Sequence, residues 1–272
     1  MAIRLEIPVF GAAAASQAIE LGASRIELNA AGSYPDGGLT PSLEDLRSVA
    51  HVNVPVRIMI RPRGPLPGLQ TRDFIYSDEE VAQMEAAILT FKETGLLNQR
   101  RGDGFVFGIL KEEEPTPDSS SEAGTSTRRC RVDKERCARL IDASYPFKTV
   151  FHRAFDEVVS CDGDDELQSW EAGFNDIARV SFDGVLTSGG LGRAAQNVGM
   201  LERIIAKAKV RGLEIIVGGG VRRQNVGDLV QRLGLRDRSR SLHVVVHSAC
   251  LASAESEAID AEEVAAIVSQ LI

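Results

Sequence analysis

The feature that most constrains the fold is an alternation of short apolar runs with segments of helical periodicity. Strands that alternate with helices predict parallel strands joined by crossover helices, and eight such units are typical of a closed (β/α)8 TIM barrel. We therefore predict one α/β domain over residues 1–272, with an open doubly wound sheet as the alternative; no GxGxxG turn follows the first run, which weakens a dinucleotide-binding version. The eight runs cover residues 5–10, 25–30, 55–61, 104–110, 148–155, 184–188, 214–218 and 242–247.

Helix start signals follow several of these runs. Ser77 and Glu80 have the spacing of a capping box, while Ser42 and Asp133 are favourable N-caps before periodic apolar residues. Residues 260–272 place apolar side chains on one face, as an outer barrel helix requires. Residues 111–131 are rich in Ser, Thr, Glu and Pro, and we predict a disordered loop there.

The composition excludes several classes of partner. A net charge of −8 argues against nonspecific binding to nucleic acid or to an anionic membrane, because both need a basic surface. The chain also has no apolar stretch long enough to span a membrane. Its four cysteines have no CxxC spacing, so they indicate reduced thiols rather than a zinc motif. We expect a cytoplasmic protein whose partner is a small molecule, an ion or another protein.

Strand alternation predicts which polar side chains face the barrel interior. In the second run Ile26 and Leu28 share the apolar face that meets the helices, which leaves Glu27 and Asn29 pointing inward. The same reasoning turns Glu6 inward from the first run, Met59 and Arg61 from the third, and His152 from the fifth. Barrel interiors are normally apolar, so these groups predict either a catalytic or binding site at the carboxyl ends of the strands or a structural Glu–Arg–His network.

Two glycine-rich turns follow the later runs. Backbone N–H groups in such turns can hold an anion, as they do in the phosphate sites of barrels, although glycine can also serve only to permit a tight turn. The residues are Ser188, Gly189 and Gly190 after the sixth run, and Gly218, Gly219 and Gly220 after the seventh.

Several ordered segments together resemble the CutC copper homeostasis family, whose members are single-domain (β/α)8 barrels. RIELNAAGSYPDGGLTPSLEDL is similar to a strand and loop of that family, and VRIMIRPRG with DFIYSDEEVAQME to its third strand and the helix that follows. FVFGIL, TVFHRAFD, FDGVLTSGG and VGGGV resemble its later strand ends. The likeness extends over residues 5–221 and is interrupted by residues 111–131.

The resemblance implies a cytosolic protein that handles copper and forms a homo-oligomer, with no established reaction. It also implies a polar pocket. Carried over position by position, the pocket residues are Glu6, Glu27, Arg61, His152, Arg153 and Asp156, with Ser188 and the turn of Gly218, Gly219 and Gly220 on the other side.

The chain departs from the family at the natural copper(I) ligands. The family carries cysteine at the ends of its first two strands, where this sequence has Pro8 and Asn29. Copper(I) prefers soft sulfur, which neither residue supplies. Met59 and His152 are softer candidates nearby, although a thioether in a barrel more often serves packing. The four cysteines lie in the insertion, in or beside helices, or after the last strand, so we do not expect them to rebuild the lost pair.

Three functions remain open at this point. The first is binding or buffering of copper, with copper(I) as the ion that the resemblance implies. The second is an isomerase or lyase acting on a small anionic or phosphorylated substrate. In it Glu27 or Glu6 is the general acid or base, Arg61 orients the anion and His152 transfers a proton. The third is a noncatalytic scaffold. Fold alone does not separate them, because barrels host many unrelated functions.

Overall fold

The computed structural model describes residues 2–66, 73–112, 130–161, 166–253 and 256–272, and these residues form a closed barrel of eight parallel strands. The predicted TIM barrel is therefore confirmed. Consecutive barrel strands are neighbours, and β10 pairs with β1 to close the ring. The barrel strands are β1 (Arg4–Phe10), β2 (Arg25–Asn29), β3 (Val56–Met59), β4 (Gly104–Phe107), β7 (Lys148–Phe151), β8 (Gly184–Thr187), β9 (Glu214–Val217) and β10 (Val244–His247).

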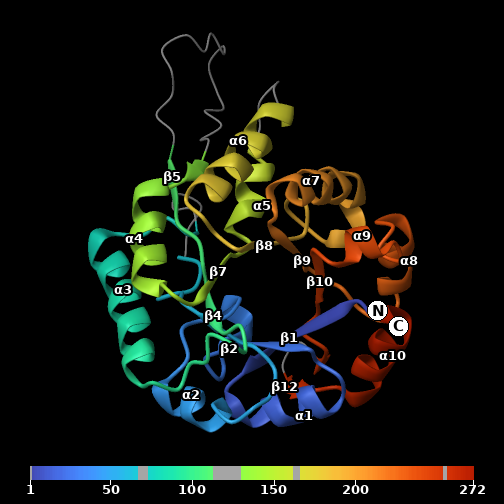
Figure 1. Ribbon diagram of the computed structural model, residues 1–272, viewed down its shortest axis with the longest axis horizontal. Helices are drawn as coiled ribbons and strands as arrows, with labels where there is room; N and C mark the ends of the chain where they lie inside the picture. Colours follow the sequence, from blue (N-terminus) through green and yellow to red (C-terminus); the bar gives the residue numbers. More distant parts are fainter. Residues whose placement is uncertain (1, 67–72, 113–129, 162–165, 254–255) are drawn as a thin grey trace.

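Helices surround the barrel, as Figure 1 shows. The predicted capping box is present at the start of α3, and Ser42 and Asp133 cap α2 and α4. The helices are α1 (Ala15–Glu20), α2 (Leu43–Val49), α3 (Asp78–Glu93), α4 (Lys134–Ser144), α5 (Ala154–Val159), α6 (Glu166–Arg179), α7 (Val198–Arg211), α8 (Val226–Arg232), α9 (Arg238–Ser241) and α10 (Ala261–Leu271). Short 3-10 turns are η1 (Ala12–Ala14), η2 (Tyr34–Asp36) and η3 (Ala194–Gln196).

The last helix completes the ring of helices beside the first strand. Val264, Ile267 and Leu271 of α10 are buried, as the periodicity of residues 260–272 predicted. The backbone N–H of Ile3 donates to the carbonyl of Leu271 at 2.9 Å, which holds the two ends of the chain together (Figure 1). Nowhere in the part of the chain that the structure describes is a helix both long and apolar enough to cross a membrane.

The core has two parts with different compositions. Outward-facing aliphatic side chains of the strands pack against the helices in one large cluster. A small second cluster fills the barrel interior with one residue from each of six strands: Met59, Val106, Val150, Leu186, Ile216 and Val245. Among the described residues, β1 and β2 contribute nothing to this apolar layer. The interior is therefore polar on the side of these two strands, where Glu6 and Glu27 lie buried.

Two antiparallel hairpins lie outside the barrel sheet. β5 (Leu110–Glu112) pairs antiparallel with β6 (Cys130–Val132), and β11 (Leu251–Ser253) with β12 (Ser256–Ile259). The predicted loop at 111–131 thus begins and ends in strands, which the polar composition did not indicate; its residues 113–129 lie outside the described part of the chain. The β5–β6 hairpin follows β4 and so stands at the carboxyl ends of the strands.

Candidate functional site

A pocket of about 400 Å3 opens at the carboxyl ends of the barrel strands. Its lining includes five residues that strand alternation turned inward: Glu27, Asn29, Met59, Arg61 and His152. Pro8 lines it as well, so both positions at which the resemblance expects cysteine face this pocket. This is the end of the barrel at which (β/α)8 proteins place their chemistry.

Glu6 lies buried beneath the pocket between two cationic or ionisable partners. One carboxylate oxygen contacts Nε of Arg25, and the other lies 2.7 Å from Nδ1 of His247. Burial alone would raise the pKa of Glu6, but the charge of Arg25 and the hydrogen bond with His247 lower it to about 2. Glu6 is therefore a carboxylate at any physiological pH.

Glu27 has a different environment from Glu6. Its Oε1 accepts a weak hydrogen bond of 3.3 Å from the amide of Asn29, and its Oε2 is buried with no partner among the described residues. Burial raises the pKa of Glu27, and the negative charge of Glu6 acts in the same direction, while His247 and Asn29 oppose them. Two neighbouring carboxyl groups thus have pKa values shifted in opposite directions.

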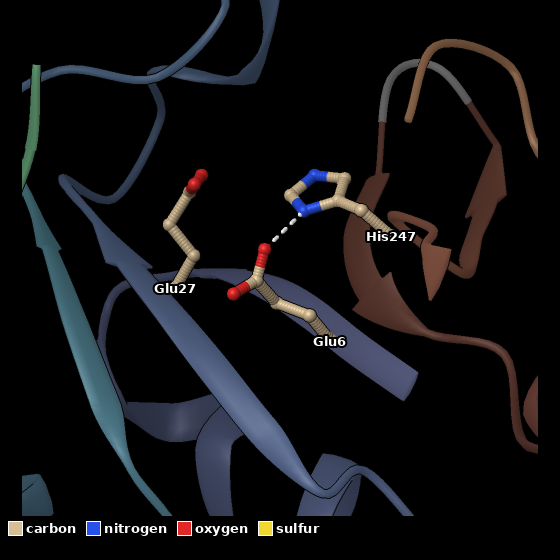
Figure 2. Close-up of side chains that lie close together, drawn as sticks. All are labelled: Glu6, Glu27 and His247. Carbon is tan, nitrogen blue, oxygen red and sulfur yellow. Dashed lines mark hydrogen bonds and ion pairs between the residues drawn. The ribbon is translucent and has the colours of Figure 1, made fainter. Parts of the chain in front are cut away.

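The side chains of Glu6, Glu27 and His247 converge on one point, as Figure 2 shows. One ligand atom from each lies within 4.8 Å of the others. Burial alone would lower the pKa of His247, but the hydrogen bond to Glu6 and the charges of Glu27 and Glu6 raise it. The predicted site did not include His247. The feature that could have revealed His247 is closure of the barrel, because closure pairs β10 with β1 and sets His247 opposite Glu6.

Arg61 lines the pocket but has little free charge to offer a ligand. Its Nη2 is 2.7 Å from a carboxylate oxygen of Asp73, and its Nη1 donates to the carbonyl groups of Asp36 and Gly38. The guanidinium also lies over the ring of Phe74, 5.2 Å from its centroid. Arg61 thus ties the loop after β2 to the loop after β3, and its charge is largely balanced by Asp73.

His152 is a neutral ring at the pocket wall. Its Nδ1 accepts a hydrogen bond of 3.2 Å from the backbone of Ala154, and its Nε2 is buried without a partner among the described residues. Burial and the charge of Arg61 lower its pKa to about 3. The structure brings it to the pocket with Met59, but not into the cluster of Glu6, Glu27 and His247.

We expect the His152 imidazole to stay neutral from pH 5 to pH 8, because a pKa of about 3 lies below this range. Two-dimensional NMR of the ring resonances over this range checks the expectation, with the exposed His51 as the reference for a solvent-accessible ring. A titration of the His152 signals with a midpoint inside the range would contradict it and would restore His152 as a proton carrier near neutral pH.

The turn of Ser188, Gly189 and Gly190 is organised by an internal carboxylate. Asp156, which is 1% exposed, accepts the backbone N–H groups of Ser188 at 3.0 Å and Gly190 at 3.3 Å. Its other oxygen accepts from Nε of Arg153 at 2.8 Å. These donors, predicted to hold a ligand anion, are therefore already bound to Asp156, and the turn does not line the pocket.

The second glycine turn does reach the pocket. Gly219 and Gly220 line it and have φ angles of +89° and +72°, which favour glycine. A Cβ at Gly219 would lie 2.6 Å from the Cβ of Ser188, so the two turns are in close contact. Arg222 and Ser248, which were not predicted, line the same wall, and Arg222 donates to the hydroxyl of Ser248 at 3.3 Å.

Sequence comparison shows that this chain has relatives in one protein family. The family model described as the CutC family matches residues 3–244. The "Copper homeostasis protein cutC homolog" of Homo sapiens is 33% identical over 231 residues, which cover 85% of this chain and 70% of the relative. A "family protein CutC" of Salmonella enteritidis is 34% identical over 248 residues, covering 90% and 82% of the two chains.

Solved structures agree on the fold. The copper homeostasis protein CutC from Streptococcus agalactiae superimposes with a TM-score of 0.65 at 24% identity, covering 90% of this chain and 98% of that one. Phosphoribosyl anthranilate isomerase from Thermotoga maritima gives a TM-score of 0.53 at 16% identity, over 99% and 98% of the two chains. At these identities the likeness concerns the barrel architecture alone.

Proposed function

This chain belongs to the CutC family, and from that premise we propose that it is a copper homeostasis protein that binds copper at the barrel mouth. The observation that carries the binding proposal is the cluster of Glu6, Glu27 and His247. Family membership supports the physiological role, and the cluster supplies a place where an ion could be held. We extend the proposal to a cytoplasmic location and to a homo-oligomer. Sedimentation velocity tests the oligomeric state.

The donor set favours copper(II) over copper(I). The cluster offers carboxylate oxygen and imidazole nitrogen, which suit the divalent ion, whereas copper(I) prefers sulfur. Pro8 and Asn29 stand where the family pattern carries its thiols. The amide oxygen of Asn29 is itself buried without a partner among the described residues, so it adds a further oxygen donor beside Glu27.

Electrostatics also support an ion at this point. Glu6 and Glu27 repel one another, and Glu27 is buried with one oxygen unsatisfied, which costs free energy in the absence of a cation. Glu6 accepts from Nδ1 of His247 and leaves the second ring nitrogen facing away from it (Figure 2). A carboxylate that orients an imidazole in this way is a common support for a metal ligand.

We expect Glu27→Gln and His247→Ala to weaken copper(II) binding by at least about 100-fold, because even the loss of an outer-shell partner costs about 10- to 100-fold. Isothermal titration under matched buffer measures the affinity, and electron paramagnetic resonance reports whether nitrogen and oxygen ligate the ion. Affinity should also fall as pH is lowered, since protons compete for Glu27 and His247, whose pKa values are raised.

The control is His51→Ala, which removes an exposed histidine away from the pocket lining and should leave the affinity unchanged. Equal copper(II) affinity in the wild type and in both cluster variants would overturn the proposal for this site, as would an absence of stoichiometric binding in the wild type.

A second candidate function is catalysis on a small anionic substrate. The observation that favours it is the raised pKa of Glu27 beside a pocket that also contains Arg222 and the glycine turn, because a carboxyl group of raised pKa can act as general acid and base. The engagement of Arg61 by Asp73 weakens its predicted role in orienting an anion. A metal-free protein that turns over such a substrate and is inactivated by Glu27→Gln would favour catalysis over copper binding.

A further inference from the structure

A second pocket, which we call the amino-end pocket, lies at the end of the barrel opposite the mouth and has a volume of about 360 Å3. Arg57, Lys148 and Glu214 line it, and they occupy the first or second positions of β3, β7 and β9. None of these three residues lines the mouth pocket. Among the described residues, the remaining Arg, Lys, Asp and Glu of its lining are Arg4, Asp183 and Arg211. These charged groups have no part in the proposed copper site.

Strand register accounts for the amino-end pocket. Arg57, Lys148 and Glu214 each stand two positions before a residue of the apolar layer, so they share its inward direction and lie closer to the amino ends of the strands. The corresponding positions of β4 and β8 are Gly104 and Gly184, which put no side chain into the interior. Gly104 pairs with Arg57 on one side and with Lys148 on the other. Two cationic side chains therefore flank a position that has no side chain.

Arg57 is a buried cation without a carboxylate partner. Its residue is 6% exposed, its Nη1 donates to the carbonyl of Gly102, and its Nε is buried with no hydrogen-bond partner among the described residues. No carboxylate in the described part of the chain forms an ion pair with it. Burial and the charge of Arg25 lower the pKa of Arg57 to about 10, which leaves it charged at neutral pH. A buried charge without a partner costs free energy, and a bound anion offsets that cost.

The two carboxylates of the amino-end pocket are already engaged by other cations. Oδ1 of Asp183 lies 2.6 Å from Nζ of Lys148. The two oxygens of Glu214 lie 2.7 Å from Nη2 of Arg4 and 2.6 Å from Nη1 of Arg25. Both acidic side chains thus have partners of their own, and neither is left to balance the charge of Arg57 by direct contact.

Arg211 supplies a second cation without a carboxylate partner. It ends α7, its Nη2 donates to Oδ1 of Asn175 at 3.4 Å, and it forms no ion pair with the described residues. The lining of the pocket therefore has an excess of two positive charges, because four cations stand against two carboxylates: Arg4, Arg57, Lys148 and Arg211 against Asp183 and Glu214. A phosphate group carries about −1.5 to −2 charge at pH 7, which matches this excess.

We propose that the amino-end pocket binds a dianionic phosphate group, either free or carried by a small molecule, with Arg57 and Arg211 as its cationic ligands. The guanidinium group presents its donors in a fixed fork that matches phosphate oxygens. A volume of about 360 Å3 leaves room for a carrier beside the phosphate. Barrels of this type place their chemistry at the opposite end, so the phosphate here is a bound ligand and not the reacting group. The proposal does not depend on copper binding at the mouth.

The test is isothermal titration at low ionic strength with inorganic phosphate and, separately, with glycerol 3-phosphate. The wild type should bind one anion per chain, and Arg57→Gln and Arg211→Gln should each bind at least about 10-fold more weakly, the loss expected for one hydrogen bond between charged groups. Arg211 is exposed, so its variant tests the site without changing a buried residue. The matched control, Arg203→Gln, removes an exposed arginine of the same helix outside the pocket lining and should bind as the wild type does.

The two probes distinguish the source of the phosphate group. Tighter binding of glycerol 3-phosphate than of inorganic phosphate supports a small phosphorylated molecule as the ligand. Equal or weaker binding of glycerol 3-phosphate supports free phosphate. Both results support the site, provided that the affinity falls in Arg57→Gln and Arg211→Gln.

NMR of the Nε–H group of Arg57, assigned by its absence from Arg57→Gln, locates the bound anion in the wild type. This signal should shift on addition of phosphate, and it should still shift in Arg222→Gln, which removes an arginine of the mouth pocket. Circular dichroism establishes that each variant is folded. Binding that is unchanged in both Arg57→Gln and Arg211→Gln, a response of the Arg57 signal that disappears in Arg222→Gln, or an absence of binding of both probes by the wild type would overturn the inference.

Discussion

Replacement of Glu6 by glutamine is expected to lower the free energy of unfolding by about 3–5 kcal/mol, the usual effect of removing one partner from a buried ion pair. The glutamine has nearly the same volume, so the effect is electrostatic. The substitution leaves Arg25, which is 5% exposed, with Glu214 as its remaining carboxylate partner, and it replaces the charged acceptor of His247 by a neutral amide. Chemical denaturation at neutral pH measures the loss.

The pH dependence identifies the cause of this loss. The pKa of Glu6 is lowered from 4.5 to about 2 on folding, so its contribution to stability is fully present above pH 4.5. The contribution disappears as pH falls from 4.5 towards 2, and the difference between wild type and Glu6→Gln should shrink over that interval. Glu44→Gln, in an exposed pair with Arg47, is the control and should change stability by less than about 0.5 kcal/mol. A pH-independent difference would contradict the electrostatic explanation.

Asp156→Ala is expected to destabilise the protein by a similar amount, about 3–5 kcal/mol, because it leaves several buried hydrogen-bond donors without their acceptor. Thr187 Oγ1 donates to Asp156 at 2.5 Å, the hydroxyl of Ser188 at 2.8 Å, and the backbone of Gly190 at 3.3 Å. Thr187, Ser188 and Gly190 are all buried, so these donors lose a partner away from bulk solvent. The turn after β8 should lose its defined conformation.

Thermal and chemical denaturation measure this loss, and hydrogen exchange of the Ser188 and Gly190 amides locates it. The control is Asp142→Ala, because Asp142 is an exposed residue of α4 and its removal should change stability by no more than about 0.5 kcal/mol. If Asp156→Ala cost less than about 1 kcal/mol, with both amides still protected, the turn would be held by something other than this carboxylate.

Much of the barrel could be predicted because its signals are local. Ser77 and Glu80 are three residues apart, and their capping box depends only on that spacing. Alternation within one strand likewise turned Glu27 and Asn29 into the interior, where both line the pocket. Hydrophobic periodicity of this kind is a property of neighbouring residues, and it survives in any fold that buries the apolar face.

The interaction partners could not be predicted in the same way. Arg61 was expected to meet a ligand, yet it meets Asp73 of its own loop and the carbonyl groups of Asp36 and Gly38 on the loop after β2. Asp156 was expected to bind a substrate, but it accepts a hydrogen bond from the backbone of Ser188, in the turn that was itself predicted to bind an anion. Both outcomes depend on how loops from different strands approach one another, which residue spacing does not specify.

The sequence by itself determined the eight strand and helix units, the helix caps, the inward polar side chains and the absence of the expected thiols at Pro8 and Asn29. Only the tertiary structure decided that His247 joins Glu6 and Glu27, and that Cys130 meets Cys161. The physical reason is range: strands and caps arise from contacts between residues a few positions apart, whereas a site is made where ring closure and helix packing bring distant segments within a few ångströms.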